Sequence, residues 1–156
     1  AVLLEATALL RERVSGIHLV IVGEGPERDV LQRQIDALHL TGTAGLVGSQ
    51  DPAPWLTKAS VFAMPSLHEG WGVAAVEAAL VGVPVVMSAT GCAAWLEAQG
   101  SAEVVSLPVS ASSLAAALER SLSRATTPLK HVPSAQDVAA EQIRHWQEAI
   151  GSRQGK

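Results

Sequence analysis

The 156-residue chain is predicted to form an α/β domain, a Rossmann-like, doubly wound parallel sheet with helices on both faces. Short apolar runs rich in β-branched residues alternate along it with segments whose apolar residues recur at helical spacing. This alternation is typical of βαβ units, and strands of such a sheet are buried on both sides. A single domain of this length buries about two thirds of its unfolded surface.

The composition is that of a globular domain, with 48% hydrophobic and 17% charged residues. The formal net charge is −4 and no basic run is present, which argues against nucleic acid as the main ligand. The single cysteine excludes an internal disulfide, and no apolar stretch reaches transmembrane length. With no signal peptide recognisable, we expect a cytoplasmic protein. The chain opens in mid-helix without Met, so we expect a piece of a longer protein.

The first βα unit is predicted from the start of the chain. Residues 2–14 place their apolar and charged residues on opposite faces of a helix. The run "IHLVIVG" over 17–23 indicates a buried strand that Gly23 ends. A turn through Gly25-Pro26 leads into a helix over about 27–39, with its apolar residues on one side.

The next unit is shorter. We expect strands over 44–48 and 60–66, separated by a short helix over 51–59 whose prolines lie in its first turn, where proline is tolerated. The strand at 60–66 ends in Pro-Ser, and an apolar helix follows over 71–81.

The second half repeats the alternation less regularly. The predicted elements are a strand over 83–89, a loop and short helix over 90–100, and an edge strand over 102–108. Ser caps open a helix over 110–125 with leucines at helical spacing. We divide the chain into a domain over 1–125, a linker over 126–134, a C-terminal helix over 135–150 and a tail over 151–156.

Ligands of such sheets bind beyond the carboxyl ends of the strands. The loops at these ends cover residues 23–27, 48–52, 65–72 and 89–94.

The segment "LHEGWGVAAVEAALVGVPVV", residues 67–86, places Glu77 in an almost wholly apolar helix. A helix that is apolar all round is expected to be buried, and a buried carboxylate without a partner is costly. Glu69 stands eight residues earlier, in the loop before the helix.

The loop over 65–73 has the features of an anion site. Gly70 and Gly72 allow close approach to the backbone, and a helix begins beside them with free N–H groups. Glu69 and Glu77 lie at most about 12 Å apart along the helix axis. This span suits two hydroxyl-bearing groups joined by a diphosphate, as in a nucleotide sugar. The alternative from spacing alone is a tight turn followed by a solvent-facing glutamate.

The segment "PSLHEGWGVAAVEAALVGVPVV" strongly resembles the signature of family 4 retaining glycosyltransferases of the GT-B architecture, with its two glutamates eight positions apart. The resemblance covers residues 1–150 and includes "HLVIVGEGPERDVL", "LVG" at 46–48 and "SSLAAALERSLS". It implies the C-terminal, donor-binding domain of a retaining enzyme that transfers a hexosyl-type sugar from a nucleotide-diphosphate donor.

The resemblance also implies roles for individual residues. Glu69 would contact hydroxyls of the transferred sugar and is the candidate catalytic residue, and Glu77 would bind the ribose hydroxyls. The backbone of Gly70, Trp71, Gly72 and Val73 would face the diphosphate and the sugar. The implied chemistry needs no protein-bound metal, cofactor or enzyme nucleophile, because the leaving diphosphate assists attack on the same face.

Several parts of the family pattern are expected to lie outside this chain. They are the first central strand, the Arg and Lys that grip the diphosphate, and the N-terminal acceptor domain; Arg28 and Lys58 do not take the place of the basic pair. The isolated fragment should therefore be inactive. Peripheral association with the inner face of a membrane, if it occurs, would involve the absent domain.

The absent strand belongs between the strands at 17–22 and 60–64. Its absence would leave two facing unpaired edges, which are prone to pairing with other chains. We expect either that another chain fills the gap or that the sheet closes up.

Residues 90–100 depart from the family pattern, since Cys92 and Ala94-Trp95 replace Gly-Gly and a following Glu. We interpret Cys92, Trp71, Trp55 and Trp146 as packing residues. His68 is interpreted as a solvated loop residue, and Gly23, Gly25 and Pro26 as turn formers. The remaining histidines show no metal-ligand spacing.

Two other functions remain as alternatives. A nucleotide-sugar epimerase shares the GT-B architecture but not the spacing of the glutamates, and a non-catalytic binding or assembly module would need no chemistry.

Overall fold

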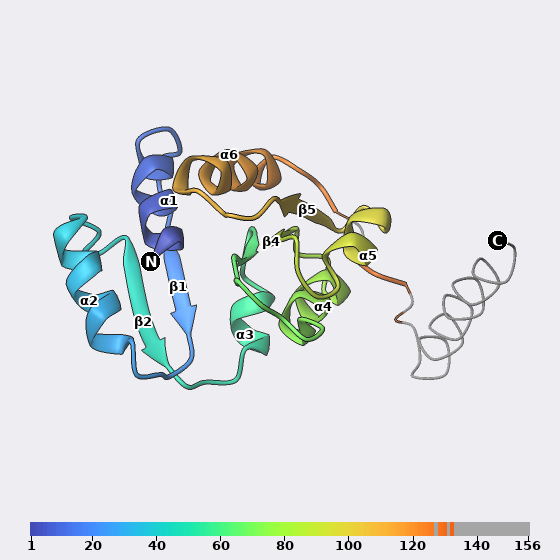
Figure 1. Ribbon diagram of the computed structural model, residues 1–156, viewed down its shortest axis with the longest axis horizontal. Helices are drawn as coiled ribbons and strands as arrows, with labels where there is room; N and C mark the ends of the chain where they lie inside the picture. The colour runs from blue at the N-terminus through green and yellow to red at the C-terminus, as the bar shows by residue number, and fades with distance from the viewer. Residues whose placement is uncertain (127, 131, 133–156) are drawn as a thin grey trace, which may run out of the picture.

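The computed structural model describes residues 1–126, 128–130 and 132 (Figure 1). All helices and strands predicted within residues 1–125 are present, most of them shorter at their ends than expected. The predicted helix over 135–150 and the tail over 151–156 lie outside the described residues. The elements in chain order are α1 (Val2–Arg11), β1 (Leu19–Val22), α2 (Arg28–Ala37), β2 (Ala44–Gly48), α3 (Ala53–Leu56), β3 (Phe62–Met64), α4 (Val73–Leu80), β4 (Val85–Ser88), α5 (Ala93–Ala98), β5 (Ala102–Val105) and α6 (Ala111–Leu122).

The strands form two parallel sheets. β1 pairs with β2, with Leu19 opposite Ala44, and the second sheet has the order β3-β4-β5. β5 is an edge strand, as predicted. The predicted α/β class and the parallel pairing are thus confirmed. The strands do not form one continuous sheet, because β1 and β3 are not paired with each other.

The three-stranded sheet has helices on both faces, as predicted. All four residues of the central strand β4 are buried. Val85 and Met87 pack with buried residues of α4 and α5, whereas Val86 packs with α1 and α6 on the opposite face. Successive side chains of a strand point to opposite sides, so β4 joins the two halves of the core.

The β1–β2 pair is covered differently. Leu19 and Ile21 pack with Leu4 of α1 and Ile35 of α2. Val20 points to the opposite side and is 40% exposed. In the part of the chain that the structure describes, helices on both faces are therefore found only for the three-stranded sheet.

The expected closure of the sheet around a missing strand is wrong. β1 is paired only with β2 and β3 only with β4 among the described residues. Helix α1 contacts both parts of the sheet, since Leu4 packs toward the β1–β2 pair while Ala6 and Leu10 pack with α6 and the second sheet. Figure 1 shows α1 and α6 side by side above the two sheets. That another chain supplies the missing strand stays a prediction.

Part of the predicted linker packs against the domain. The Leu129 N–H donates to the Ala79 carbonyl at 3.0 Å, and the Thr126 hydroxyl donates to the Gly82 carbonyl at 2.5 Å. These contacts lie at the C-terminal end of α4. None of the helices that the structure describes combines the length and the apolar character that a membrane span requires.

The edge strands give a prediction for amide hydrogen exchange. The N–H groups of Leu19 and Phe62 donate to β-strand neighbours at 2.8 Å, so those of Val20 and Ala63 point to the open edges. We expect Val20 and Ala63 to exchange at least about tenfold faster than Leu19 and Phe62, because exposed edge amides open without global unfolding.

The measurement is residue-resolved hydrogen exchange at two protein concentrations. If, at low protein concentration, the Val20 and Ala63 amides were as well protected from exchange as those of Leu19 and Phe62, the prediction that the edges of β1 and β3 are unpaired would be contradicted. Protection of Val20 and Ala63 that rises with concentration would show that a second molecule covers them.

Candidate functional site

The candidate site is formed by two loops at the carboxyl ends of neighbouring strands, residues 65–72 after β3 and 89–92 after β4. Gly72 is the N-cap of α4 and has φ of 92°, in the left-handed region. A Cβ at this position would lie 2.8 Å from Met64 Cε. Glycine therefore allows the chain to turn from the strand into the helix in this confined space.

The N-terminus of α4 has no side-chain cap. The Gly72 carbonyl accepts the N–H groups of Ala75 and Val76, and the first N–H groups of a helix have no intrahelical acceptor. By contrast, Ser110 and Ser113 form a capping box at the start of α6. Among the described helices only α6 has a capping box, so free N–H groups at the start of α4 are a general feature of helices, and the glycine loop beside them is what makes this start a candidate anion site.

Helix α4 buries one face only, which overturns the expectation that an almost wholly apolar helix is buried all round. Ala75, Val76, Ala78 and Ala79 are buried. Val73, at 62% exposure, and Leu80, at 41%, lie on the other face, where Glu77 is also exposed. Within residues 1–126, 128–130 and 132, no hydrogen bond or ion pair engages the Glu77 carboxylate.

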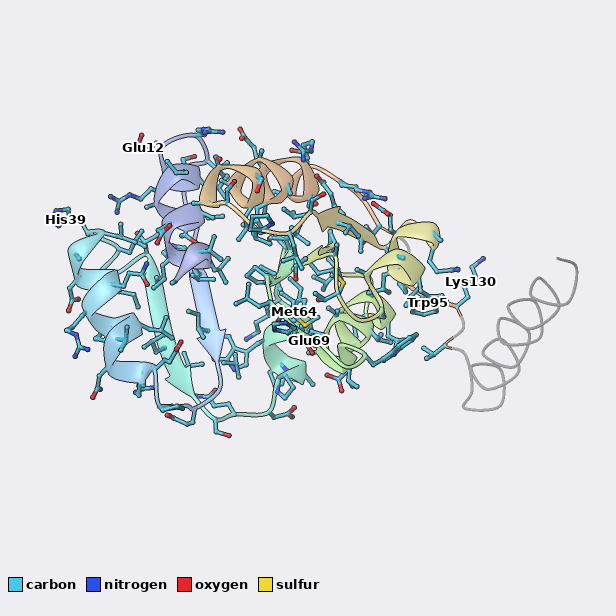
Figure 2. All side chains as sticks on the ribbon, in the orientation of Figure 1. Glu12, His39, Met64, Glu69, Trp95 and Lys130 are labelled. Atoms are coloured by element: carbon cyan, nitrogen blue, oxygen red, sulfur yellow. The ribbon has the colours of Figure 1, made fainter. Side chains whose placement is uncertain are left out.

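Glu69 has a different environment. It is half-buried, and its Oε1 accepts a hydrogen bond from the Ser66 hydroxyl at 2.8 Å. The hydroxyl of Ser88, a fully buried residue of β4, donates to the Ser66 carbonyl. Figure 2 shows Glu69 beside Met64, near the end of β3. The first predicted glutamate is thus held by the fold and the second is free in solvent.

The two loops are tied together at Trp71. The Cys92 N–H donates to the Trp71 carbonyl at 2.7 Å. Gly91 has φ of 54°, and a Cβ there would lie 2.4 Å from the same carbonyl oxygen. The Trp71 and Trp95 rings pack with centroids 6.0 Å apart, although Trp71 stays 39% exposed. The packing role predicted for Trp71 is confirmed through this contact with Trp95.

Cys92 is a packing residue, as predicted, with 1% of its surface exposed. The pKa of its thiol is raised, mainly by burial; a backbone hydrogen bond lowers this pKa, and the negative charge of Glu69 raises it. These effects keep the thiol protonated at neutral pH.

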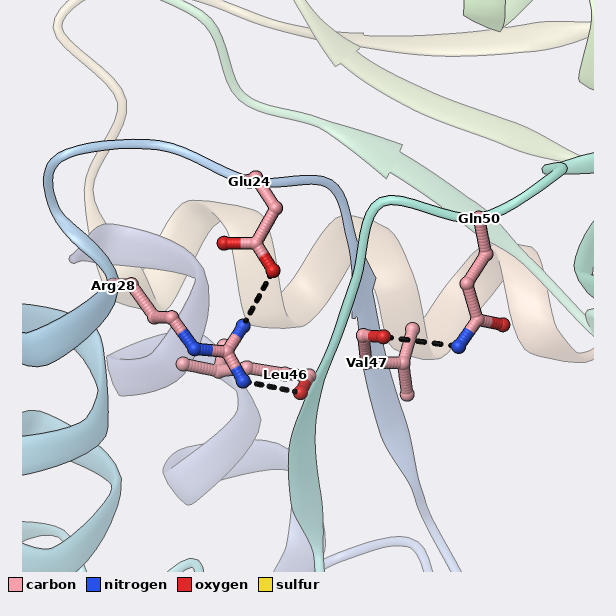
Figure 3. Close-up of polar contacts among 5 residues, drawn as sticks. All are labelled: Glu24, Arg28, Leu46, Val47 and Gln50. Carbon is pink, nitrogen blue, oxygen red and sulfur yellow. Dashed lines mark hydrogen bonds and ion pairs between the residues drawn. The ribbon is translucent and has the colours of Figure 1, made fainter.

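The end of the β1–β2 pair is closed by its own contacts (Figure 3). Arg28 lies 3.3 Å from the Glu24 carboxylate and donates to the Leu46 carbonyl at 3.2 Å. The Gly23 N–H donates to the Gly48 carbonyl at 2.7 Å in an isolated β-bridge, so Gly23 joins the ends of the two strands instead of forming the turn that was predicted for it. Arg28 is therefore engaged within this corner.

The neighbouring loop carries a second small network. The Gln50 amide donates to the Val47 carbonyl at 2.9 Å and accepts the Trp55 indole N–H at 3.0 Å. Trp55 is half-buried, in keeping with its predicted packing role, and His68 is exposed, as predicted. Trp146 lies outside the described residues.

A surface hollow lies away from these loops. A hollow of about 370 Å³ runs between β5 and α6, lined among others by Glu103, Ser110 and Arg120. It is open and contains neither candidate glutamate, so we place the candidate site at the two loops, where Glu69 precedes the uncapped start of α4 and Glu77 lies further along the same helix. Among the described residues, no group of three His, Cys, Asp or Glu side chains could hold a metal ion.

The sequence reasoning missed Ser66, Ser88 and Gly91 as parts of this arrangement. Ser66 lies three residues before Glu69, a short-range signal that could have been noticed. No local signal indicates that Ser88 or Gly91 reaches the preceding loop, because both contacts depend on the pairing of β3 with β4.

Comparison with known proteins places this geometry in context. Residues 1–138 match the family described as Glycosyl transferases group 1. A 2-deoxystreptamine N-acetyl-D-glucosaminyltransferase from Niallia circulans is 28% identical over 109 residues, which are 68% of this chain and 28% of that protein. A GDP-mannose-dependent phosphatidylinositol monomannoside mannosyltransferase from Mycolicibacterium smegmatis is 38% identical over 100 residues, 57% of this chain and 26% of that protein.

Solved structures have the same fold. The lipopolysaccharide glycosyltransferase WaaG superposes with a TM-score of 0.70 at 22% identity, over 78% of this chain and 33% of that one. The Anabaena protein HepE in complex with UDP and glucose superposes with a TM-score of 0.69 at 25% identity, over 78% and 34%. The chain therefore spans about a third or less of the proteins that it matches.

The tight crossing of the two loops predicts that Gly91 is essential for stability. Gly91→Ala should lower the free energy of unfolding by roughly 3 kcal/mol, because it combines a left-handed backbone with a clash against a backbone oxygen. The measurement is urea unfolding followed by tryptophan fluorescence.

Gly25→Ala is the matched control. Gly25 has no atom within 4 Å of an added Cβ and no positive φ, so its substitution should change stability by less than about 1 kcal/mol. Equal effects of the two substitutions would contradict the tight crossing.

Proposed function

Because the chain belongs to the group 1 glycosyl transferases, we propose that it is the nucleotide-sugar-binding domain of a retaining glycosyltransferase that transfers a hexosyl-type sugar. The observation that carries this proposal is the uncapped start of α4, which Glu69 and Glu77 flank in the sequence. A helix start of this kind attracts anions, and carboxylates accept hydrogen bonds from hydroxyl groups. HepE, with UDP and glucose bound, supports a donor of this chemical class.

In this proposal the diphosphate lies at the start of α4. The N–H groups of Gly72 and Val73 point toward its oxygens. Gly70 is exposed and has no atom within 4 Å of an added Cβ, so it permits close approach of the diphosphate to the backbone. The positive end of the helix dipole adds an attraction worth about 0.3–1 kcal/mol at an exposed helix end. The backbone of Trp71 lies beside the same group.

The two glutamates then bind opposite ends of the donor. The half-buried Glu69 accepts hydrogen bonds from hydroxyls of the transferred sugar, and Glu77 accepts them from the ribose. Glu77 lies four residues into α4, about 6 Å along the axis from Val73, which separates the ribose site from the diphosphate site. An exposed carboxylate is already hydrated, so we expect its net contribution to be modest.

The reaction that we propose for the whole enzyme needs no enzyme nucleophile. The acceptor oxygen attacks the anomeric carbon on the face that the diphosphate leaves, and the bond between this carbon and the phosphate oxygen breaks. The acceptor proton passes to the departing phosphate, so the products are a glycoside of unchanged anomeric configuration and a nucleoside diphosphate. We propose that Glu69 orients the sugar during this step and that no protein-bound metal is required.

Glycosyl transfer also requires an acceptor site and the exclusion of water. Since this chain spans about a third or less of its relatives, we expect the 156-residue protein to bind the donor without transferring the sugar.

The alternatives are less well supported. The family match favours a transferase over the epimerase reading. A non-catalytic module would bind a donor equally well, so only transfer by the whole protein distinguishes it from an enzyme.

The proposal predicts weak, selective donor binding. Ligand-observed NMR with UDP-, GDP-, ADP- and dTDP-sugars should show one nucleotide class bound with a Kd of about 1 mM, equivalent to about 4 kcal/mol. Glu77→Ala should weaken this binding by about five- to tenfold, because it removes hydrogen bonds between a charged group and the ribose.

Glu97→Ala is the control, since Glu97 is an exposed glutamate on α5 and its loss changes the net charge equally. Binding that is unchanged in Glu77→Ala would remove Glu77 from the ribose site. No binding of any nucleotide sugar to the natural sequence would contradict the proposed function of this chain.

A further inference from the structure

We propose that Ser66 is a positioning residue that holds the Glu69 carboxylate in the orientation needed to bind the transferred sugar. This inference rests on the proposed function and concerns how one of its two glutamates is prepared for the ligand.

The first observation is the direct contact. The Ser66 hydroxyl donates to Glu69 Oε1 at 2.8 Å, and both side chains are half-buried. A hydrogen bond to an ionised acceptor is stronger than one between neutral groups. It occupies one carboxylate oxygen and leaves Oε2 to accept from a ligand.

The second observation is that Ser66 itself is held in place. The fully buried Ser88 at the end of β4 donates its hydroxyl to the Ser66 carbonyl. The Thr90 hydroxyl lies 3.3 Å from Ser88 Oγ. A buried hydroxyl is costly without a partner, so this contact fixes the Ser66 backbone relative to the sheet.

The third observation is the contrast with Glu77. Both residues are glutamates of the same predicted site, yet Glu77 is exposed and, among the described residues, has no hydrogen-bond partner. Only Glu69 therefore loses side-chain freedom before the ligand arrives, which lowers the entropic cost of binding at that carboxylate. In the proposed site, the side chain that binds the sugar is therefore ordered before the ligand binds, whereas the side chain that binds the ribose becomes ordered only on binding.

A purely structural hydrogen bond would stabilise the loop without affecting sugar recognition. The two roles differ in what a substitution changes. If Ser66 positions Glu69, Ser66→Ala weakens binding of the nucleotide sugar but not of the nucleoside diphosphate that lacks the sugar. A structural role would change both ligands alike or neither.

The experiment uses the 156-residue protein and two NMR readouts. In the free protein, the three-bond couplings between Hα and Hβ of Glu69 report its χ1 rotamer. We expect a single rotamer in the natural sequence, rotamer averaging in Ser66→Ala, and a single rotamer again in Ser66→Thr, which keeps the hydroxyl. Well-dispersed amide spectra confirm that each variant is folded.

The second readout compares dissociation constants for a nucleotide sugar and its nucleoside diphosphate. Ser66→Ala should weaken binding of the nucleotide sugar about three- to tenfold and leave that of the diphosphate within twofold. Ser66→Thr should restore the affinity, and Ser66→Ala should have no further effect in a Glu69→Gln background. Ser123→Ala, at an exposed serine after α6, is the control and should change neither ligand.

The outcomes separate the inference from the proposed function. Rotamer averaging of Glu69 in the natural sequence, or an unchanged Glu69 rotamer in Ser66→Ala, overturns the inference, regardless of the affinities measured for the two ligands. Equal loss of both ligands in a folded Ser66→Ala variant also overturns it. The Glu69 rotamer could depend on Ser66 while the protein binds no nucleotide sugar. That combination overturns the proposed function and, with it, the assignment of Ser66 to a sugar site.

Discussion

The burial of β4 is the constraint on which the rest of the structure depends. Its four residues are buried, with Val85 and Met87 on one face and Val86 on the other, and it pairs with β3 and β5 on its two edges. A strand placed in this way fixes where its neighbours end. The loops after β3 and β4 consequently start side by side, and the Ser88 hydroxyl reaches the carbonyl of Ser66 in the preceding loop.

The site built on these strand ends combines rigid and open parts. Gly91 brings the second loop against the Trp71 carbonyl, and the Trp71–Trp95 contact adds packing at the same crossing. The start of α4 is left uncapped, and Glu77 lies exposed one turn along the same helix. In the proposed function, the rigid part orients the sugar and the open part receives the phosphates and the ribose.

Helix α1 packs against both parts of the divided sheet. Helix α1 contributes Leu4 to the cluster over the β1–β2 pair and Leu10 to the cluster over the second sheet. It therefore holds the two sheets in place without pairing β1 to β3. The strand order expected for the family predicted that these two edges would be unpaired, but it could not show whether side-chain packing would draw them together.

Local patterns in the sequence determined the fold class and the order of the elements, whereas the roles of Glu69 and Glu77 were implied by the resemblance to a family signature and stay a prediction. β-Branched runs, helical spacing and glycines at the turns act over a few residues, so their effect can be predicted without the fold. Tertiary structure decided that Glu77 is exposed, that Glu69 is held by Ser66 and that Gly91 must be glycine. The environments of Glu77 and Gly91 depend on which helix face or loop packs opposite them, and the support of Ser66 comes from Ser88. These contacts join residues distant in sequence, so spacing alone could not have revealed them.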